Sequence, residues 1–123
     1  MNQALVLIVE DDSWLAEQQA RVLGKAGYRT TISPHAIDAM ASIDDIRPDI
    51  IVLDILLTGS TALALLHELQ SYADTASIPI VVCTNLASEL ELANLKPYGV
   101  RLILDKTTML PDDVVTAVRR LLT

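Results

Sequence analysis

Short apolar runs alternate with longer amphipathic segments along the whole chain. The alternation repeats five times within 123 residues. Short runs of Val, Ile and Leu are typical of strands, and longer segments with apolar residues at every third or fourth position are typical of helices. A chain that alternates the two builds a parallel sheet with helices on its faces. The sequence therefore predicts an α/β fold with a doubly wound sheet.

The five predicted strands differ in how apolar they are. They are expected at residues 4–9, 28–32, 50–53, 78–83 and 100–104. Four of them are almost continuously apolar, as expected of strands that helices cover on both faces. The run at 28–32 instead contains Arg29, Thr30 and Thr31. It is therefore predicted to be an edge strand.

The predicted helices lie between and after these strands. They are expected at residues 13–26, 35–44, 60–72, 87–95 and 111–122. Ser13 is a residue type that caps the start of a helix, and Gly27 can adopt the left-handed conformation that ends one. Pro111 suits a first helical position. These residues support the predicted boundaries.

Composition limits the class of protein. The length is typical of one domain, and we expect a single domain over residues 1–123 with no output domain. Sixteen acidic residues against nine basic ones give a net charge of −7, which opposes direct binding to nucleic acid or to an anionic membrane surface. No apolar run reaches the roughly 20 residues that cross a bilayer.

The cysteine content indicates a compartment. Cys83 is the single cysteine and lies within an apolar run. It cannot form an internal disulfide and is expected to be buried. The first residues also lack the basic segment of a signal peptide. We therefore expect a cytoplasmic protein.

Polar residues follow four of the five predicted strands. The groups are Glu10-Asp11-Asp12, Asp54, Thr84 and Asp105-Lys106. In an open parallel sheet, chemistry is carried out at the carboxyl ends of the strands, beside the point where the strand order reverses. The sequence therefore predicts a functional site at this edge.

Three aspartates in this set indicate a metal ion. Asp11, Asp12 and Asp54 would bring like charges together, which is unfavourable unless a cation neutralises them. Mg²⁺ prefers oxygen ligands and often binds one or two carboxylates together with phosphate oxygens. Lys106 and Thr84 are suited to holding the oxygens of a phosphoryl group. The sequence thus predicts a Mg²⁺-dependent phosphoryl-transfer site.

These motifs have the order and spacing of a known family. They are Val9-Glu10-Asp11-Asp12, Ile51-Val52-Leu53-Asp54, Thr84 and Lys106. The chain resembles the response regulator receiver family of two-component signal transduction over essentially its whole length. The resemblance implies a flavodoxin-like receiver fold with five parallel strands in the order 2-1-3-4-5.

The resemblance also implies catalytic roles. Asp54 would attack a phosphohistidine on a sensor histidine kinase or phosphotransfer protein and form an acyl phosphate. Thr84 and Lys106 would hold the phosphoryl oxygens. The chain would catalyse only its own phosphorylation and dephosphorylation, and is therefore not expected to be a metabolic enzyme.

The same resemblance implies the metal ligands. Asp12 and Asp54 would bind Mg²⁺ directly, and Asp11 would contribute through water. The backbone carbonyl of Leu56 would complete the protein ligands.

The resemblance also implies a signalling surface. In the family, phosphorylation alters the face built here from segments 87–95, 100–104 and 111–122, which a downstream protein would read. Arg101 and Arg119 could join Glu91 in a homodimer surface on this face.

Several residues depart from the family pattern. Ile103 stands where an aromatic switch residue is usual, Thr107 replaces a proline, and Asn85 replaces a small residue. These departures support a rival interpretation, in which the chain is a phosphorylation-independent scaffold or protein-binding module of the same fold.

A second rival is a hydrolase that forms an aspartyl-phosphate intermediate, similar to haloacid dehalogenase-type phosphatases. Those enzymes usually carry a second aspartate two residues after the nucleophile. Leu56 occupies that position here, which argues against this interpretation.

Overall fold

Five parallel strands form one sheet in the order β2-β1-β3-β4-β5. The computed structural model describes residues 3–55, 60–85 and 87–123. The strands are β1 (Leu5–Val9), β2 (Arg29–Ser33), β3 (Ile50–Asp54), β4 (Ile80–Thr84) and β5 (Val100–Asp105). All five predicted strands and their predicted order are confirmed.

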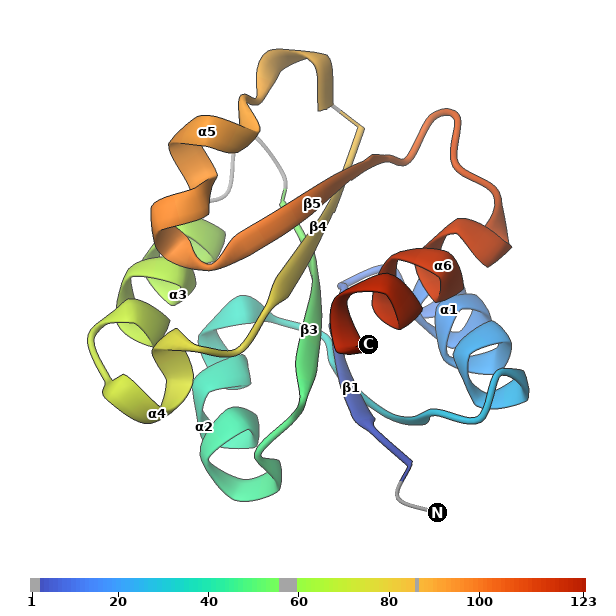
Figure 1. Ribbon diagram of the computed structural model, residues 1–123, viewed down its shortest axis with the longest axis horizontal. Helices are drawn as coiled ribbons and strands as arrows, with labels where there is room; N and C mark the ends of the chain where they lie inside the picture. The colour runs from blue at the N-terminus through green and yellow to red at the C-terminus, as the bar shows by residue number, and fades with distance from the viewer. Residues whose placement is uncertain (1–2, 56–59, 86) are drawn as a thin grey trace.

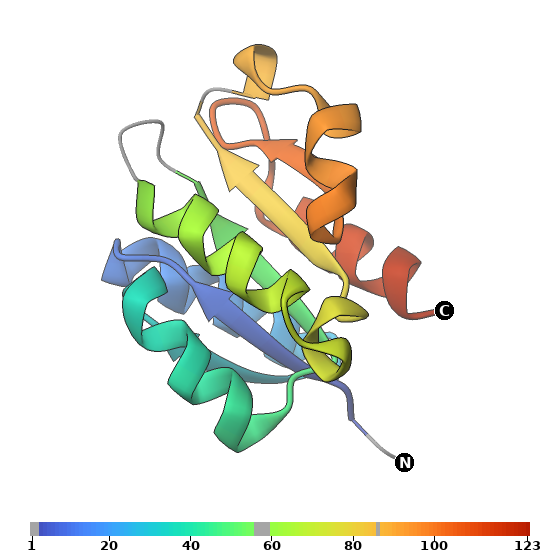
Figure 2. The same cartoon turned by 90° about the vertical axis from the view of Figure 1, so that its left-hand side faces the viewer.

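Helices cover both faces of the sheet (Figures 1 and 2). The helices are α1 (Ser13–Lys25), α2 (Ala36–Ile46), α3 (Ser60–Gln70), α4 (Ala73–Ala76), α5 (Leu92–Leu95) and α6 (Pro111–Leu122), with the 3₁₀ turns η1 (Ala87–Glu89) and η2 (Lys96–Tyr98). In Figure 1, α1 and α6 lie on one side of the sheet and α2, α3, α4 and α5 on the other. The doubly wound architecture is therefore confirmed.

The strands contribute alternate side chains to two separate cores. On the α1/α6 face the buried strand residues include Val6, Ile8, Ile50, Val52, Val81 and Cys83. On the opposite face they include Leu7, Val9, Ile51, Leu53, Ile80 and Val82. Because strand side chains alternate between faces, the even or odd position of a residue decides which helices it meets.

The predicted edge strand lies at one end of the sheet. β2 is the first strand of the sheet and pairs with β1. Arg29 and Ile32 are exposed, Thr30 and Thr31 are partly buried, and Ser33 is buried. The polar residues Thr30 and Thr31 are tolerated there because only one side of the strand is covered by a neighbour.

The predicted continuous helix at 87–95 is wrong. Glu91 has an extended backbone, with φ −108° and ψ 124°, and separates η1 from α5. Leu90 and Leu92 both pack against the core on the α2/α3 face. Two residues that are two positions apart point in nearly opposite directions on a helix, so an extended residue must lie between them.

The predicted Ser13 cap is also wrong, by one residue. Asp12 is the N-cap of α1, and its Oδ1 accepts a hydrogen bond of 3.1 Å from the backbone N–H of Leu15. Two other predicted boundary residues are confirmed. Gly27 has a φ of 99°, and Pro111 is the first residue of α6.

Within residues 3–55, 60–85 and 87–123, no helix has the length and apolar character needed to cross a bilayer.

Cys83 should be chemically inert in the folded protein. Its side chain is buried in β4, and burial raises the pKa of its thiol to about 12. Because the thiolate is the reactive form, we expect no reaction with a disulfide reagent at pH 8 until the protein unfolds. Thiol labelling as a function of urea concentration measures this. Rapid labelling without denaturant would contradict it.

Two glycines should respond to alanine in opposite directions. Gly99 has a φ of 89°, and a Cβ there would lie 3.1 Å from Nε2 of Gln70. We expect Gly99→Ala to lower the free energy of unfolding by about 1–2 kcal/mol, because an L-residue is strained in this conformation. Urea denaturation measures the change.

Gly24→Ala is the matched control. Gly24 lies in α1, and a Cβ there would meet nothing within 4 Å. Alanine should raise the free energy of unfolding by roughly 0.5–1 kcal/mol, since glycine loses more backbone entropy in a helix. Equal effects of the two substitutions would show that backbone conformation does not decide the outcome.

Candidate functional site

Three charged residues extend the α1/α6 face of the sheet at its carboxyl edge. Glu10 continues the alternation of Val6 and Ile8, and Asp54 continues that of Ile50 and Val52. Lys106 likewise continues the alternation of Leu102 and Leu104. Since side chains two residues apart share a face, these three charges meet above the same core. Strand alternation alone thus brings them together.

An ammonium group bridges two carboxylates at this edge. Nζ of Lys106 lies 2.6 Å from Oε1 of Glu10 and 2.8 Å from Oδ1 of Asp54. The three side chains are only 11%, 3% and 6% exposed, in the order Lys106, Glu10, Asp54. Little solvent screens these charges, so their interaction is strong.

One oxygen of Asp54 is incompletely satisfied. Oδ1 is buried, and no donor in the described part of the chain makes a well-directed hydrogen bond to it. Its 2.8 Å contact with Lys106 is therefore an ion pair rather than an aligned hydrogen bond. A buried anionic oxygen in this condition can accept a further cation.

Burial changes the ionisation of the site. Loss of hydration and, to a smaller extent, the nearby Asp54 raise the pKa of Glu10 to about 7, although Lys106 opposes the shift. Burial also acts to lower the pKa of Lys106, but its contacts with Asp54 and Glu10 outweigh this and raise it. Lys106 therefore stays positively charged at neutral pH.

The acidic residues form a group that suits a metal ion. Carboxylate oxygens of Glu10, Asp11 and Asp54 all lie within 4.8 Å of one another. Asp11 is exposed, whereas Glu10 is buried, so the group is open on one side. A hard divalent cation with oxygen ligands and bound water fits such a half-open set of carboxylates.

The structure brings together some of the predicted site residues and not others. Asp11 and Asp54 share the acidic group, and Lys106 contacts it. The carboxylate of Asp12 instead caps α1, and its role as a direct ligand stays a prediction. Leu56, the predicted carbonyl ligand, lies outside the described residues.

Thr84 lies at the carboxyl end of β4, next to the strand that carries Asp54. It is 1% exposed, and its backbone carbonyl accepts a hydrogen bond of 2.9 Å from the N–H of Lys106. By alternation it follows Ile80 and Val82 toward the α2/α3 face. Thr84 thus reaches the edge from the opposite face of the sheet.

The residues that depart from the family pattern also have defined places. Ile103 packs partly buried against the core on the α2/α3 face, and Asn85 is exposed just after β4. The N–H and hydroxyl of Thr107 donate to Oδ1 of Asp105, at 2.9 and 2.6 Å. Among the described residues there is no cis peptide bond, so the peptide before Thr107 is trans.

Glu10 is not among the metal ligands predicted from the sequence. The acidic pair predicted from the sequence was instead Asp11 and Asp12, the two consecutive aspartates that come after Glu10. The signal that identifies Glu10 is its position two residues after Ile8, on the face that Asp54 and Lys106 also use. Its backbone N–H donates to Ser33, so it continues the β1–β2 ladder.

Residues 6–119 match the response regulator receiver domain family. Among curated proteins, the transcriptional regulatory protein BaeR of Escherichia coli O6:H1 is 32% identical over 90 residues, which is 73% of this chain. The aligned region is 36% of the length of BaeR, so the chain spans about a third of this relative.

Solved structures share the fold over nearly the whole chain. The receiver domain of a signal transduction histidine kinase from Syntrophus aciditrophicus is 27% identical, with a TM-score of 0.82. That match covers 97% of this chain and 89% of the other. The chemotaxis protein CheY4 of Vibrio cholerae is 22% identical, with a TM-score of 0.85 and coverage of 97% and 98%, and supports the fold alone. Strand order, charged edge and family match agree, and the chain belongs to the response regulator receiver domain family.

Proposed function

We propose that this receiver domain accepts a phosphoryl group on the carboxylate of Asp54. Receiver domains interact with histidine kinases or phosphotransfer proteins, and we take a phosphohistidine of such a partner as the donor. The observation that carries the proposal is the ammonium of Lys106, 2.8 Å from Asp54 at an edge where three carboxylates gather.

The transfer needs one bond to form and one to break. An oxygen of Asp54 attacks phosphorus, the phosphorus–nitrogen bond breaks, and the imidazole leaves with the electron pair and takes up a proton. Negative charge on the phosphoryl oxygens must be stabilised as this happens. Lys106 is close enough to Asp54 to supply part of that stabilisation, and we assign Thr84 the role of a hydroxyl donor.

Mg²⁺ is the cofactor that this site would hold. Receiver domains typically bind Mg²⁺. The donor set fits, because Glu10, Asp11 and Asp54 offer only carboxylate oxygens and Oδ1 of Asp54 lacks an aligned hydrogen bond. When bound, the ion would neutralise charge on the carboxylates and on the phosphoryl oxygens.

The phosphorylated domain would signal through the face formed by α5, β5 and α6. We propose that a downstream protein reads this face, and that Arg101, Arg119 and Glu91, all exposed, can join two copies of the chain there. A free buried cysteine suits action in the reducing cytoplasm.

Acetyl phosphate with Mg²⁺ should add one phosphoryl group to the protein. Asp54→Asn should reduce labelling by at least about 100-fold, because an amide is a far weaker nucleophile than a carboxylate. Intact-mass measurement at successive times gives the labelling rate.

Asp112→Asn is the control for this experiment. Asp112 is an exposed aspartate in the first turn of α6, so its substitution should leave the rate unchanged. Labelling of Asp54→Asn at the wild-type rate would refute Asp54 as the acceptor. If the wild-type protein is not labelled, the phosphorylation-independent scaffold becomes the better interpretation.

Mg²⁺ binding should depend on Glu10 more than on Asp12. Glu10→Gln should weaken Mg²⁺ affinity by about tenfold or more, because it removes one charged oxygen ligand from the acidic group. Asp12→Asn should change the affinity little, since asparagine also caps helices and the Asp12 carboxylate contacts Leu15. Isothermal titration calorimetry measures both.

The two substitutions test two different ligand sets. Loss of affinity in Asp12→Asn with none in Glu10→Gln would support the ligands expected from the sequence, and would reject the group with Glu10. Urea denaturation of each variant would show that the comparison is made between folded proteins.

A further inference from the structure

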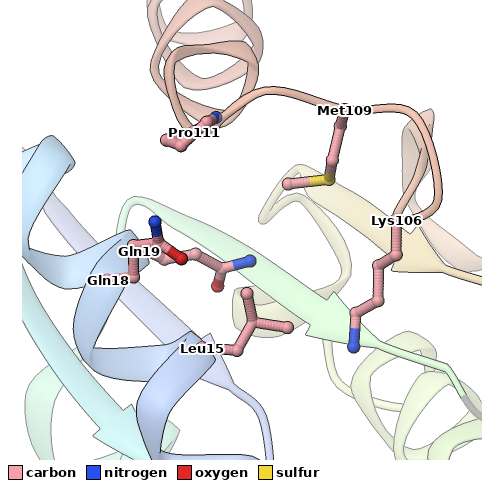
Figure 3. A pocket seen from close by; sticks show the side chains of 6 residues that line it. All are labelled: Leu15, Gln18, Gln19, Lys106, Met109 and Pro111. Atoms are coloured by element: carbon pink, nitrogen blue, oxygen red, sulfur yellow. The ribbon is translucent and has the colours of Figure 1, made fainter.

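A cavity of about 250 Å³ lies between α1 and the segment that links β5 to α6 (Figure 3). Three residues of α1 line it, together with two from the segment after β5 and the proline at the start of α6. The lining residues are Leu15, Gln18, Gln19, Lys106, Met109 and Pro111. Most of this lining is apolar.

Gln19 is the unusual residue in this wall. It lies on the buried face of α1 with Ala16 and Leu23, where helical spacing would favour an apolar side chain. It is 4% exposed, and its Nε2 has no hydrogen-bond partner among the described residues. A buried amide donor without an acceptor is costly. It therefore identifies where an acceptor would bind.

Water alone is a poor occupant. A water molecule occupies about 30 Å³ in the liquid and needs two to four polar partners when buried. The cavity has room for several waters, but only the amides of Gln18 and Gln19 could bond them, because Leu15, Met109 and Pro111 are apolar and the Lys106 ammonium is paired. A ligand with an apolar body and one acceptor oxygen matches the lining better.

The charge of the lining favours an uncharged ligand. Of the six lining residues, Lys106 alone is charged, and its ammonium is paired with Glu10 and Asp54. In Figure 3 the Lys106 side chain lies across the cavity from the two glutamines, and its ammonium is held by Glu10 and Asp54. These six residues therefore include no unpaired positive charge that would bind an anionic ligand.

We infer that this cavity binds a small uncharged molecule that has an apolar body and a carbonyl or hydroxyl oxygen. The oxygen accepts a hydrogen bond from Nε2 of Gln19, and the apolar body packs against Leu15, Met109 and Pro111. The volume lies just below the usual range of small-molecule pockets, so the ligand is compact. The inference does not depend on phosphorylation of Asp54.

Two matched probes test the inference. 4-Fluoroacetophenone carries a carbonyl oxygen, whereas 4-fluoroethylbenzene has a similar shape and none. Fluorine NMR titration of the full chain should show tighter binding of the ketone. Methyl resonances of Leu15 and Met109 should shift on binding and so locate the probe.

Gln19→Leu removes the donor and keeps the size of the side chain. It should weaken ketone binding by about tenfold, the effect of one buried hydrogen bond, and leave hydrocarbon binding unchanged or tighter. Gln18→Leu is the matched control, because Gln18 also lines the cavity but is only partly buried. It should preserve the preference for the ketone.

Several results would overturn the inference. These are no binding of the ketone by the wild-type protein, equal ketone affinity in wild type and Gln19→Leu, loss of the preference in Gln18→Leu alone, or resonance shifts at a different surface. Gln19→Met provides a second variant without the donor if Gln19→Leu does not fold. Amide spectra of each variant establish that it is folded.

Discussion

The charge of Lys106 is what allows acidic side chains to converge at the edge of this sheet. Burying a carboxylate is unfavourable unless a cation or hydrogen bonds compensate it. Glu10, Asp11 and Asp54 set three carboxylates against one ammonium, which leaves two negative charges when all are ionised. A bound divalent cation would supply that charge. The raised pKa of Glu10 is the other way for the site to lower its charge, by binding a proton.

Strand alternation explains why these particular residues meet. Glu10, Asp54 and Lys106 follow three different strands, yet each is an even number of positions from apolar residues of the same core. Sheet order completes the arrangement, because β1 and β3 are direct neighbours while β5 lies beyond β4. Lys106 reaches across β4 with its long side chain. A shorter cation at the same position would not contact both carboxylates.

The predictable parts of the structure are those that a local pattern determines. Aliphatic runs predicted four of the five strands, and the polar residues at 28–32 predicted the edge strand, because burial on two faces selects apolar residues. The prediction of one helix at 87–95 is wrong because Leu90 and Leu92 both contact the core. Those contacts depend on tertiary packing, which the local sequence pattern does not show. Glu10 was missed for a different reason. Its position two residues after Ile8 is visible in the sequence, but the two consecutive aspartates that follow it are a more obvious metal-binding pattern.

Helix α1 connects the acidic group with the neighbouring cavity. Its N-cap is Asp12, its buried face includes Gln19, and both lie on the side of the sheet where Lys106 emerges. The stem of Lys106 forms one wall of the cavity while its ammonium binds Glu10 and Asp54. A leucine in place of Gln19 would complete the apolar face at no cost in unsatisfied hydrogen bonds. Packing therefore gives no reason for an amide there, whereas an acceptor bound in the cavity does.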